Sequence, residues 1–238
     1  MQRIPISEIS KLPYYGNKFP FIPYSFQSKI KVSIVFAKHL YKMIGFFPFL
    51  LFWLFIPFHL YRTNSKYKEG VRLMGHAFGF MARIEWLLLL VIYDLINNKY
   101  GKEKAYQFSK NAIQDASKFM MNDFYQADIL AKFEDPFEAF WEYHKAMFAN
   151  DPNYPNEFIE DTDCKVMIVK KCQNCEISKL SIPDLAPLGC DHDITGYKSI
   201  EDKVNMEFRR PQTLAKDGLP CKFMFFRKGS APENLEIK

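Results

Sequence analysis

The stretch that decides the fold lies near the end of the chain and reads VNMEFRRPQTLAKDGLPCKFMFFR (residues 204–227). Apolar side chains recur at every second position at both of its ends, in residues 204–210 and 221–227, which is the period of a half-buried strand. Asp217 and Gly218, between the two runs, are residues that favour a turn. The stretch therefore predicts two antiparallel strands that form a C-terminal hairpin.

Helices are predicted for most of the chain before this hairpin. Residues 84–96 form a run that is too short to cross a bilayer and too apolar for a surface helix, so we expect a buried central helix. Residues 102–125 place apolar side chains three to five positions apart, which predicts an amphipathic helix. Asp135, followed by Pro136 and Glu138, is typical of the start of a further helix.

One more strand is predicted upstream of the hairpin, in DCKVMIVKK (residues 163–171), whose centre is apolar and β-branched. Because the predicted helices fill the first two-thirds of the chain, we expect an α+β fold in which they pack on one face of a small antiparallel sheet. A chain of 238 residues is long enough to bury a core without disulfide bonds.

The net charge of +5 conceals an uneven distribution of charge along the chain. Residues 1–72 hold 11 lysines and arginines against two acids, Glu8 and Glu69, whereas residues 73–238 hold 21 bases against 25 acids. The asymmetry predicts a basic N-terminal segment, residues 1–72, followed by one domain, residues 73–238. The bases of the segment are interleaved with Phe, Leu and Pro rather than clustered in an Arg-rich stripe, so nucleic acid is not the expected partner.

The basic segment encloses nineteen residues without a formal charge, MIGFFPFLLFWLFIPFHLY (residues 43–61). This length approaches the roughly 20 residues that span a bilayer, but Pro48 and Pro57 leave residues 49–56 as the unbroken piece. We expect a kinked segment in the membrane interface, with Trp53 at the acyl boundary and lysines on anionic headgroups. A buried helical hairpin packed on the domain is the alternative.

The five cysteines indicate in which cellular compartment the protein is expected. Their number is odd, and the first 40 residues lack the compact apolar core of a secretory signal. Both observations favour a reducing environment with free or metal-bound thiols. We therefore expect a cytoplasmic protein that associates with a membrane through residues 1–72.

Four groups that can carry chemistry are adjacent in LGCDHDITGY (residues 188–197), namely Cys190, Asp191, His192 and Asp193. Glycines on both sides of the group favour a loop, and a turn would bring the thiol and the imidazole together. We expect this loop to line a catalytic pocket. A set of metal ligands and a plain polar loop are the alternatives.

Three residues elsewhere are candidates for the same pocket. His144 falls on the apolar stripe of its helix, where a histidine is either a hydrogen-bonded core residue or a neutral base that lines a cavity. Arg210 falls on the core face of its strand, where a guanidinium requires an anion from the protein or from a ligand. Cys221 begins the last strand, and a thiol there is more often inert than reactive.

A zinc site is the alternative use of the thiols. Cys172 and Cys175 have the spacing of a zinc knuckle, and Cys190 with His192 would complete three thiolates and one imidazole. The second pair is separated by one residue instead of two, and the acids beside it do not suit a closed site. We therefore expect no stoichiometric metal, and nothing in the sequence indicates a cofactor.

The order of residues in the C-terminal third forms the pattern R-x-x-T-L-A-x-x-G-x-x-C-x-F, from Arg210 to Phe223. Together with Cys172 and the Cys190 group upstream, it resembles the L-2-amino-thiazoline-4-carboxylic acid hydrolase family. The resemblance covers roughly residues 73–228 and leaves out the basic segment. Lys222 stands after the cysteine of the pattern, where the resemblance leads us to expect an acid.

The resemblance implies a hydrolase that opens a small cyclic amidine or thiazoline carboxylate ring to a carbamoyl amino acid. Such a reaction needs an anion clamp, a nucleophile or an activated water, and a proton carrier. Cys190 would be the nucleophile, and His192 with a neighbouring acid would be the base and its orienter. The implied substrate-binding residues are Arg210, Arg209, Thr213 and Cys221, and the implied catalytic residues are Cys190, His192, Asp191, Asp193 and His144.

A membrane-associated small-molecule-binding or accessory protein without catalysis is the rival function. The aromatic content of 17% and the apolar segment favour the rival, whereas the group of thiol, carboxylates and imidazole favours the enzyme. The expected partners are a small-molecule substrate and, through residues 1–72, a membrane surface. The sequence does not indicate an oligomeric state.

Overall fold

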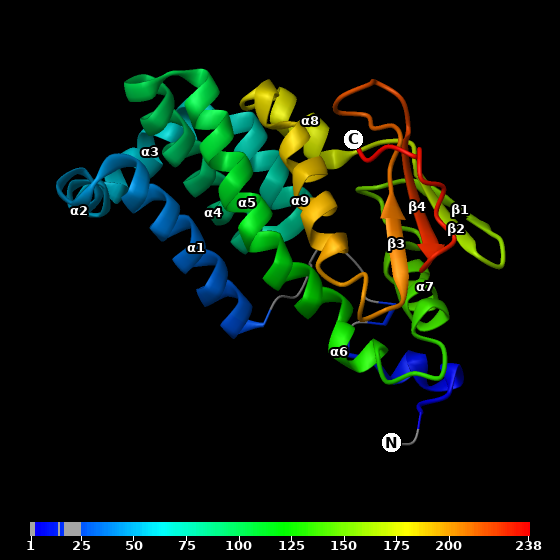
Figure 1. Cartoon of the computed structure of the whole chain (residues 1–238). Coiled ribbons are helices and arrows are strands. Elements are labelled where there is room, and N and C mark those ends of the chain that lie inside the picture. Colours follow the sequence, from blue (N-terminus) through cyan, green and yellow to red (C-terminus); the bar gives the residue numbers. More distant parts are fainter. Residues whose placement is uncertain (1–2, 14, 17–24) are drawn as a thin grey trace.

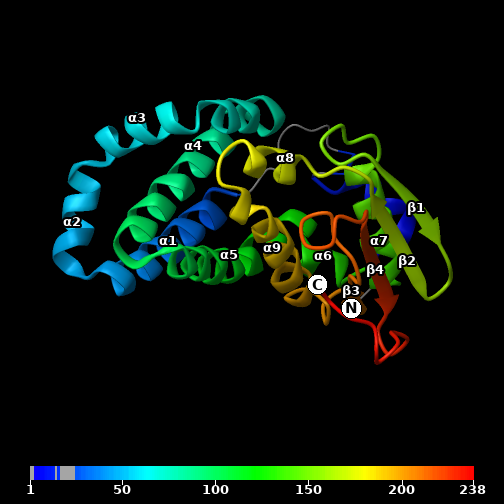
Figure 2. The same ribbon diagram turned by 90° about the horizontal axis from the view of Figure 1, so that it is seen from above.

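The computed structural model describes residues 3–13, 15–16 and 25–238, so residues 1, 2, 14 and 17–24 of the predicted basic segment lie outside the described residues. The structure has a helical part and a part built on a β-sheet, and α9 (Pro187–Lys198) lies between the two (Figure 1). The same arrangement is visible from above (Figure 2).

The core of the helical part surrounds α4 (Lys68–Tyr100), which contains the predicted central helix. Leu90 and Ile96 are fully buried there, which confirms the expectation for residues 84–96. α4 bends at Gly79, whose φ of 90° a residue with a side chain rarely adopts. The helix crosses residue 72, so the expected boundary between segment and domain falls inside a helix. The other long helices of this part are α1 (Phe26–Ile44) and α5 (Lys102–Tyr125).

The two helices predicted from periodicity and capping are confirmed. α5 has the predicted bounds, and its Ala112 and Ala116 are buried. α7 (Pro136–Phe148) begins where Asp135 accepts hydrogen bonds from the N–H groups of Phe137 and Glu138, at 3.1 and 3.2 Å. The remaining short elements are η1 (Ile6–Lys11), α6 (Ala127–Leu130), α8 (Gln173–Lys179) and η2 (Pro183–Leu185).

The sheet is antiparallel throughout and has the strand order β1-β2-β4-β3. Its strands are β1 (Asn156–Glu160), β2 (Cys164–Val169), β3 (Met206–Arg209) and β4 (Cys221–Arg227). The expected α+β class and the C-terminal hairpin are confirmed. The sequence did not predict β1, because this edge strand is mostly exposed and carries no clean apolar alternation.

The predicted strand over residues 204–210 is two residues too long at its start. Asn205 has a φ of 53°, in the left-handed region, so the ladder begins at Met206. On the face towards α7 and α9, Phe208 and Phe225 pack with Phe140, and all three side chains are fully buried. This aromatic core holds α9 against the sheet.

The uncharged residues 43–61 comprise the last residues of α1, all of α2 (Phe46–Leu54) and the first half of α3 (Ile56–Lys66). The predicted kink is present, because the two helices are bent by 71°. The unbroken piece begins at Phe46 and not at residue 49, since Pro48 lies in the first turn, where a missing N–H loses no partner. Among the described residues, no single helix is long and apolar enough to cross a bilayer, although α2 and α3 meet both criteria as a bent pair.

Candidate active site

The group of ionisable residues at 190–193 lies on a helix and not in the expected loop. α9 starts at Pro187, a residue that favours the first turn, and continues through both glycines. A Cβ on Gly196 would collide with Met121 of α5, so this glycine allows close packing of two helices. The loop prediction was wrong because the glycines serve tertiary packing rather than backbone freedom.

The helical spacing distributes these residues over two faces of α9. Cys190, Asp193 and Tyr197 are three or four positions apart and therefore share one face. Tyr197 is fully buried against Phe208 of the sheet, which fixes this face towards β3. Asp191 lies on another face, towards α5, where it accepts a hydrogen bond from the hydroxyl of Tyr106 at 2.9 Å. Adjacent residues in the sequence thus belong to different environments.

Arg210 is the centre of the sheet-side face. Its guanidinium is fully buried and donates to Asp193 Oδ2 at 2.9 Å, to the main-chain oxygen of Cys190 at 2.8 Å and to that of Lys238 at 2.6 and 2.9 Å. The anion that its position requires is therefore a protein carboxylate. Arg210 does meet Cys190 and Asp193, as expected for one cluster, but in this arrangement it is not accessible to a ligand. Its bonds join β3, α9 and the C-terminal residues.

The Cys190 thiol lies in the same buried environment. Burial raises the pKa of Cys190 to about 12, although the charge of Arg210 acts in the opposite direction. Burial likewise raises the pKa of Cys221 to about 11, and its Sγ accepts the N–H of Leu214 at 3.2 Å. Since the thiolate is the nucleophilic form of cysteine, both groups are protonated and weakly reactive at neutral pH.

Thr213 and the rest of the R-x-x-T-L-A pattern shape the loop between β3 and β4. The Thr213 hydroxyl accepts the N–H of Lys216 at 3.0 Å, and the Thr213 N–H donates to the Asp217 carboxylate at 2.9 Å. Thr213 itself is fully buried. These bonds fold the loop back towards α9 and bring Lys216 Nζ to 3.5 Å from Asp191 Oδ1.

The two histidines of the prediction are not brought together. His192 Nδ1 lies 3.4 Å from Asp193 Oδ1 on the next residue, and its Nε2 is buried without a partner among the described residues. His144 is fully buried in the aromatic core, where its Nδ1 is 2.6 Å from the hydroxyl of Tyr125. Burial lowers the pKa of His144 to about 3, so the hydrogen-bonded core histidine, one of the two alternatives, is what the structure contains.

Arg209 lies on the opposite face of β3 from Arg210. Its guanidinium donates to Glu207 Oε2 at 3.3 Å and to the main-chain oxygen of Phe208 at 2.8 Å. It therefore does not join the cluster around Cys190.

The alternative zinc set is not assembled. Cys172 and Cys175 flank the first turn of α8, and their thiols are hydrogen-bonded to each other. Cys190 and His192 are not part of this pair. In the described part of the chain, no three side chains of His, Cys, Asp or Glu form a group that could hold a metal ion.

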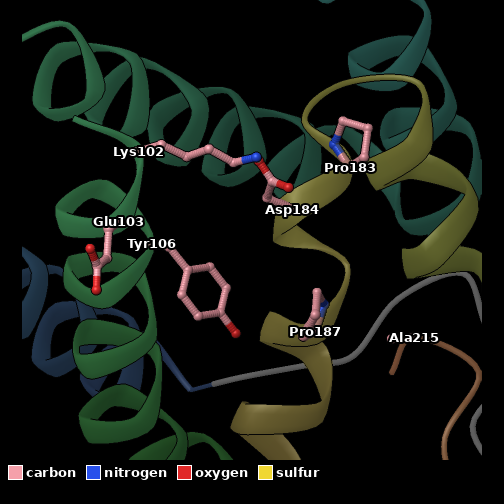
Figure 3. Close-up of a pocket in the computed structure, with 7 residues that line it drawn as sticks. All are labelled: Lys102, Glu103, Tyr106, Pro183, Asp184, Pro187 and Ala215. Atoms are coloured by element: carbon pink, nitrogen blue, oxygen red, sulfur yellow. The ribbon is translucent and has the colours of Figure 1, made fainter. Parts of the chain in front are cut away.

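A groove of about 630 Å³ lies between the first turns of α5, the η2–α9 connection and the β3–β4 loop. This volume is within the usual range for small-molecule sites. Lys102 and Asp184 form an ion pair across it at 2.7 Å, and the ring of Tyr106 extends between α5 and α9 (Figure 3). The residues that line the groove are Lys102, Glu103, Tyr106, Pro183, Asp184, Pro187 and Ala215.

The sequence did not single out Tyr106, Lys102 or Lys216 for this site. Lys102 and Tyr106 are four positions apart and so share one face of α5, which is a signal for proximity but not for a partner. Asp191 is the predicted catalytic residue that reaches the groove, through Tyr106. It is nearly fully buried, and it connects the groove with the interior of the protein.

A family model described as L-2-amino-thiazoline-4-carboxylic acid hydrolase matches residues 81–225, more than half of the 238 residues. No curated protein and no solved structure matches the chain. The matched residues include α5, α9 and the β3–β4 loop, which together form the groove. The chain belongs to the L-2-amino-thiazoline-4-carboxylic acid hydrolase family.

Proposed function

We propose that the chain is a hydrolase that opens a small cyclic amidine or thiazoline carboxylate ring to a carbamoyl amino acid. The observation that carries the proposal is the family match over residues 81–225, because every wall of the groove lies within this range. The volume of about 630 Å³ is compatible with a small ring and its carboxylate.

The reaction uses water, whose two protons end on the ring nitrogen and on the sulfur. Water adds to the ring carbon between nitrogen and sulfur, and the carbon–sulfur bond then breaks. The ring nitrogen keeps a carbamoyl group, and the sulfur leaves as a free thiol. In the first transfer, one group takes a proton from the water and passes it to the ring nitrogen. In the second, another group gives a proton to the departing sulfur and regains the remaining hydroxyl proton as the carbonyl forms.

We assign the first transfer to Asp191 and the second to Lys216. The Tyr106 hydroxyl, which lines the groove and is bonded to Asp191, would hold the attacking water beside this carboxylate. Lys216 lies next to the other carboxylate oxygen of Asp191 and would supply the proton to sulfur. Lys102, at the edge of the groove, would attract the substrate carboxylate.

This assignment differs from a thiolate mechanism with Cys190 as the nucleophile. The Cys190 thiol is protonated, and Arg210 has protein acceptors, so neither group is an available reactant. The water mechanism uses Tyr106, which lines the groove, Asp191, which is bonded to Tyr106, and Lys216, which lies 3.5 Å from Asp191.

The experiment is a ring-opening assay with 2-amino-thiazoline-4-carboxylate, in which the released thiol is titrated over time. We expect Asp191→Asn to lower turnover by about 100-fold or more, the usual scale for loss of a general base. Tyr106→Phe should lower it by about 10-fold, because one hydrogen bond to the water is lost. Asp202→Asn, which removes an exposed carboxylate paired with Lys228, is the matched control and should be as active as the unmodified chain.

Two outcomes would contradict the proposal. The first is an absence of thiol release from a folded protein that still binds the ring compound, which would favour the binding protein without catalysis. The second is full activity of Asp191→Asn, which would exclude this carboxylate as the base. Thermal melting of each variant shows whether the fold is intact.

A further inference from the structure

The elbow formed by α2 and the start of α3, residues 46–61, exposes an unusual amount of apolar surface. In α2, Phe52 is the buried side chain, while Phe47 and Leu54 are 75% and 71% exposed. Large apolar patches on a protein surface mark contacts with a partner or a membrane. The exposed apolar residues of the elbow are Phe46, Phe47, Leu50, Leu51, Trp53, Leu54, Phe55, Phe58 and Tyr61.

The elbow lies at the end of the molecule opposite the sheet. In Figure 1 and in Figure 2, α2 forms the tip of the helical part, and β1 lies at the other end. None of the described segments packs over the outer side of α2, as the exposure of Phe47 and Leu54 shows. The groove assigned to the ring compound is separate from this surface, since its lining residues belong to α5, η2, α9 and the β3–β4 loop.

The charges of the segment that contains the elbow are of one sign. No acidic residue occurs in the sequence between Glu8 and Glu69. Lys42, at the end of α1, and Arg62, on α3, are exposed on the two sides of the apolar residues. Cations that border an apolar surface match the anionic headgroups and acyl chains of a bilayer surface.

A second, apolar groove runs along the inner side of the elbow. It has a volume of about 230 Å³ and is lined by side chains of α2, α3 and the end of α4, among them Pro48, Phe52, Phe55, Leu95 and Lys99. Lys99 and His59 are the polar side chains of this groove, and its other lining side chains are apolar. This combination is suited to part of an acyl chain beneath an anionic headgroup.

We propose that the elbow is a monotopic anchor that inserts into the interface of a membrane containing anionic lipids. Insertion from one side fits the geometry better than spanning does. α2 has nine residues and is therefore about 14 Å long, less than half of the roughly 30 Å of a bilayer core. The chain bends by 71° after α2, and α1 and α3 both lead from α2 back to the rest of the helical part (Figure 2).

The test measures binding of the full chain to sedimented vesicles of phosphatidylcholine with 30% phosphatidylglycerol. We expect the double variant Phe47→Glu/Leu54→Glu to lose at least about 10-fold in affinity, because two charges would enter the acyl boundary. Ile159→Glu is the matched control. It places the same charge on an exposed apolar residue of β1, at the opposite end of the molecule, and should bind as the unmodified chain does.

A second pair of variants tests the charge requirement. Lys42→Gln/Arg62→Gln should weaken binding to the anionic vesicles severalfold, and vesicles of phosphatidylcholine alone should bind all variants weakly. Lys171→Gln/Lys198→Gln removes two exposed lysines elsewhere and should leave binding unchanged.

Three results would contradict the proposed membrane anchor. The first is absence of vesicle binding by the unmodified chain, and the second is an equal loss of binding in Ile159→Glu. The third is a dimer that forms without lipid, binds no vesicles and becomes a monomer in the Phe47→Glu/Leu54→Glu variant. The last result would assign the elbow to a second copy of the chain. Ring-opening activity of the Phe47→Glu/Leu54→Glu variant in solution should remain unchanged, so failure of the anchor does not affect the proposed hydrolase.

Discussion

The two faces of α9 differ in how their polar groups are satisfied. On the sheet side, Asp193 and the main-chain oxygen of Cys190 are bonded to the fully buried Arg210. On the α5 side, Asp191 is bonded to Tyr106, which lines an open groove. Ionisable residues that are adjacent in the sequence can therefore have separate roles, because a helix turns neighbouring side chains by about 100°.

The largest loss of stability should come from removing the Arg210 side chain. Arg210→Ala would leave Asp193 and two main-chain oxygens without their donor, so we expect the free energy of unfolding to fall by about 3 kcal/mol. This is the lower end of the scale for breaking a buried ion pair, since Asp193 remains partly exposed. Urea denaturation measures this loss.

Arg209→Ala is the matched control for that variant. Arg209 is the neighbouring residue on β3, but its ion pair with Glu207 is partly exposed on both sides, so the loss should be less than about 1 kcal/mol. Equal losses in the two variants would remove the distinction between the buried face and an ordinary surface pair.

A smaller loss of stability, which depends on pH, should come from His144, which is linked to the buried face of α9 through two tyrosines. Tyr197 is hydrogen-bonded to Tyr125, which is bonded to His144. Burial lowers the pKa of His144 in the folded chain to about 3 from an ordinary value of 6.5. The unfolded chain therefore binds a proton that the folded chain excludes, and stability is lost as the pH falls from about 6.5 towards 3.

Between pH 7 and pH 5 this one group should contribute a loss of about 2 kcal/mol. Urea denaturation at a series of pH values should show a shallower dependence for His144→Gln by that amount. His76→Gln, which changes an exposed histidine of α4, should keep the original dependence. An unchanged dependence in His144→Gln would mean that the imidazole is not held neutral by burial.

The smallest effect on activity should come from Cys190, although its position in the sequence first suggested a nucleophile. At pH 8 a thiol with a pKa of about 12 is ionised to about one part in 10⁴. We expect Cys190→Ser to change the rate of thiol release by less than about threefold. Loss of turnover in a folded Cys190→Ser variant would identify Cys190 as the nucleophile and contradict the water mechanism.

Elements that depend on local interactions could be predicted from the sequence. The bounds of α5 and the start of α7 follow from apolar periodicity and from the side-chain cap of Asp135, which need no distant partner. The hairpin of β3 and β4 follows from the alternation of its two strands. The kink between α2 and α3 follows from Pro57, which lies in the first turn of α3. The family also followed from the order of residues between Arg210 and Phe223.

Other features depend on contacts between distant parts of the chain and could not be predicted from local patterns. The segment 188–197 is a helix because α9 packs closely on α5, with Gly196 against Met121, and flanking glycines alone favoured a loop. Arg210 found its anion within the protein, a choice that the strand pattern left open. The groove joins Tyr106 to Asp191, 85 positions away. Such a contact depends on how two helices dock, and the periodicity of each helix records its buried face but not the residue that it meets.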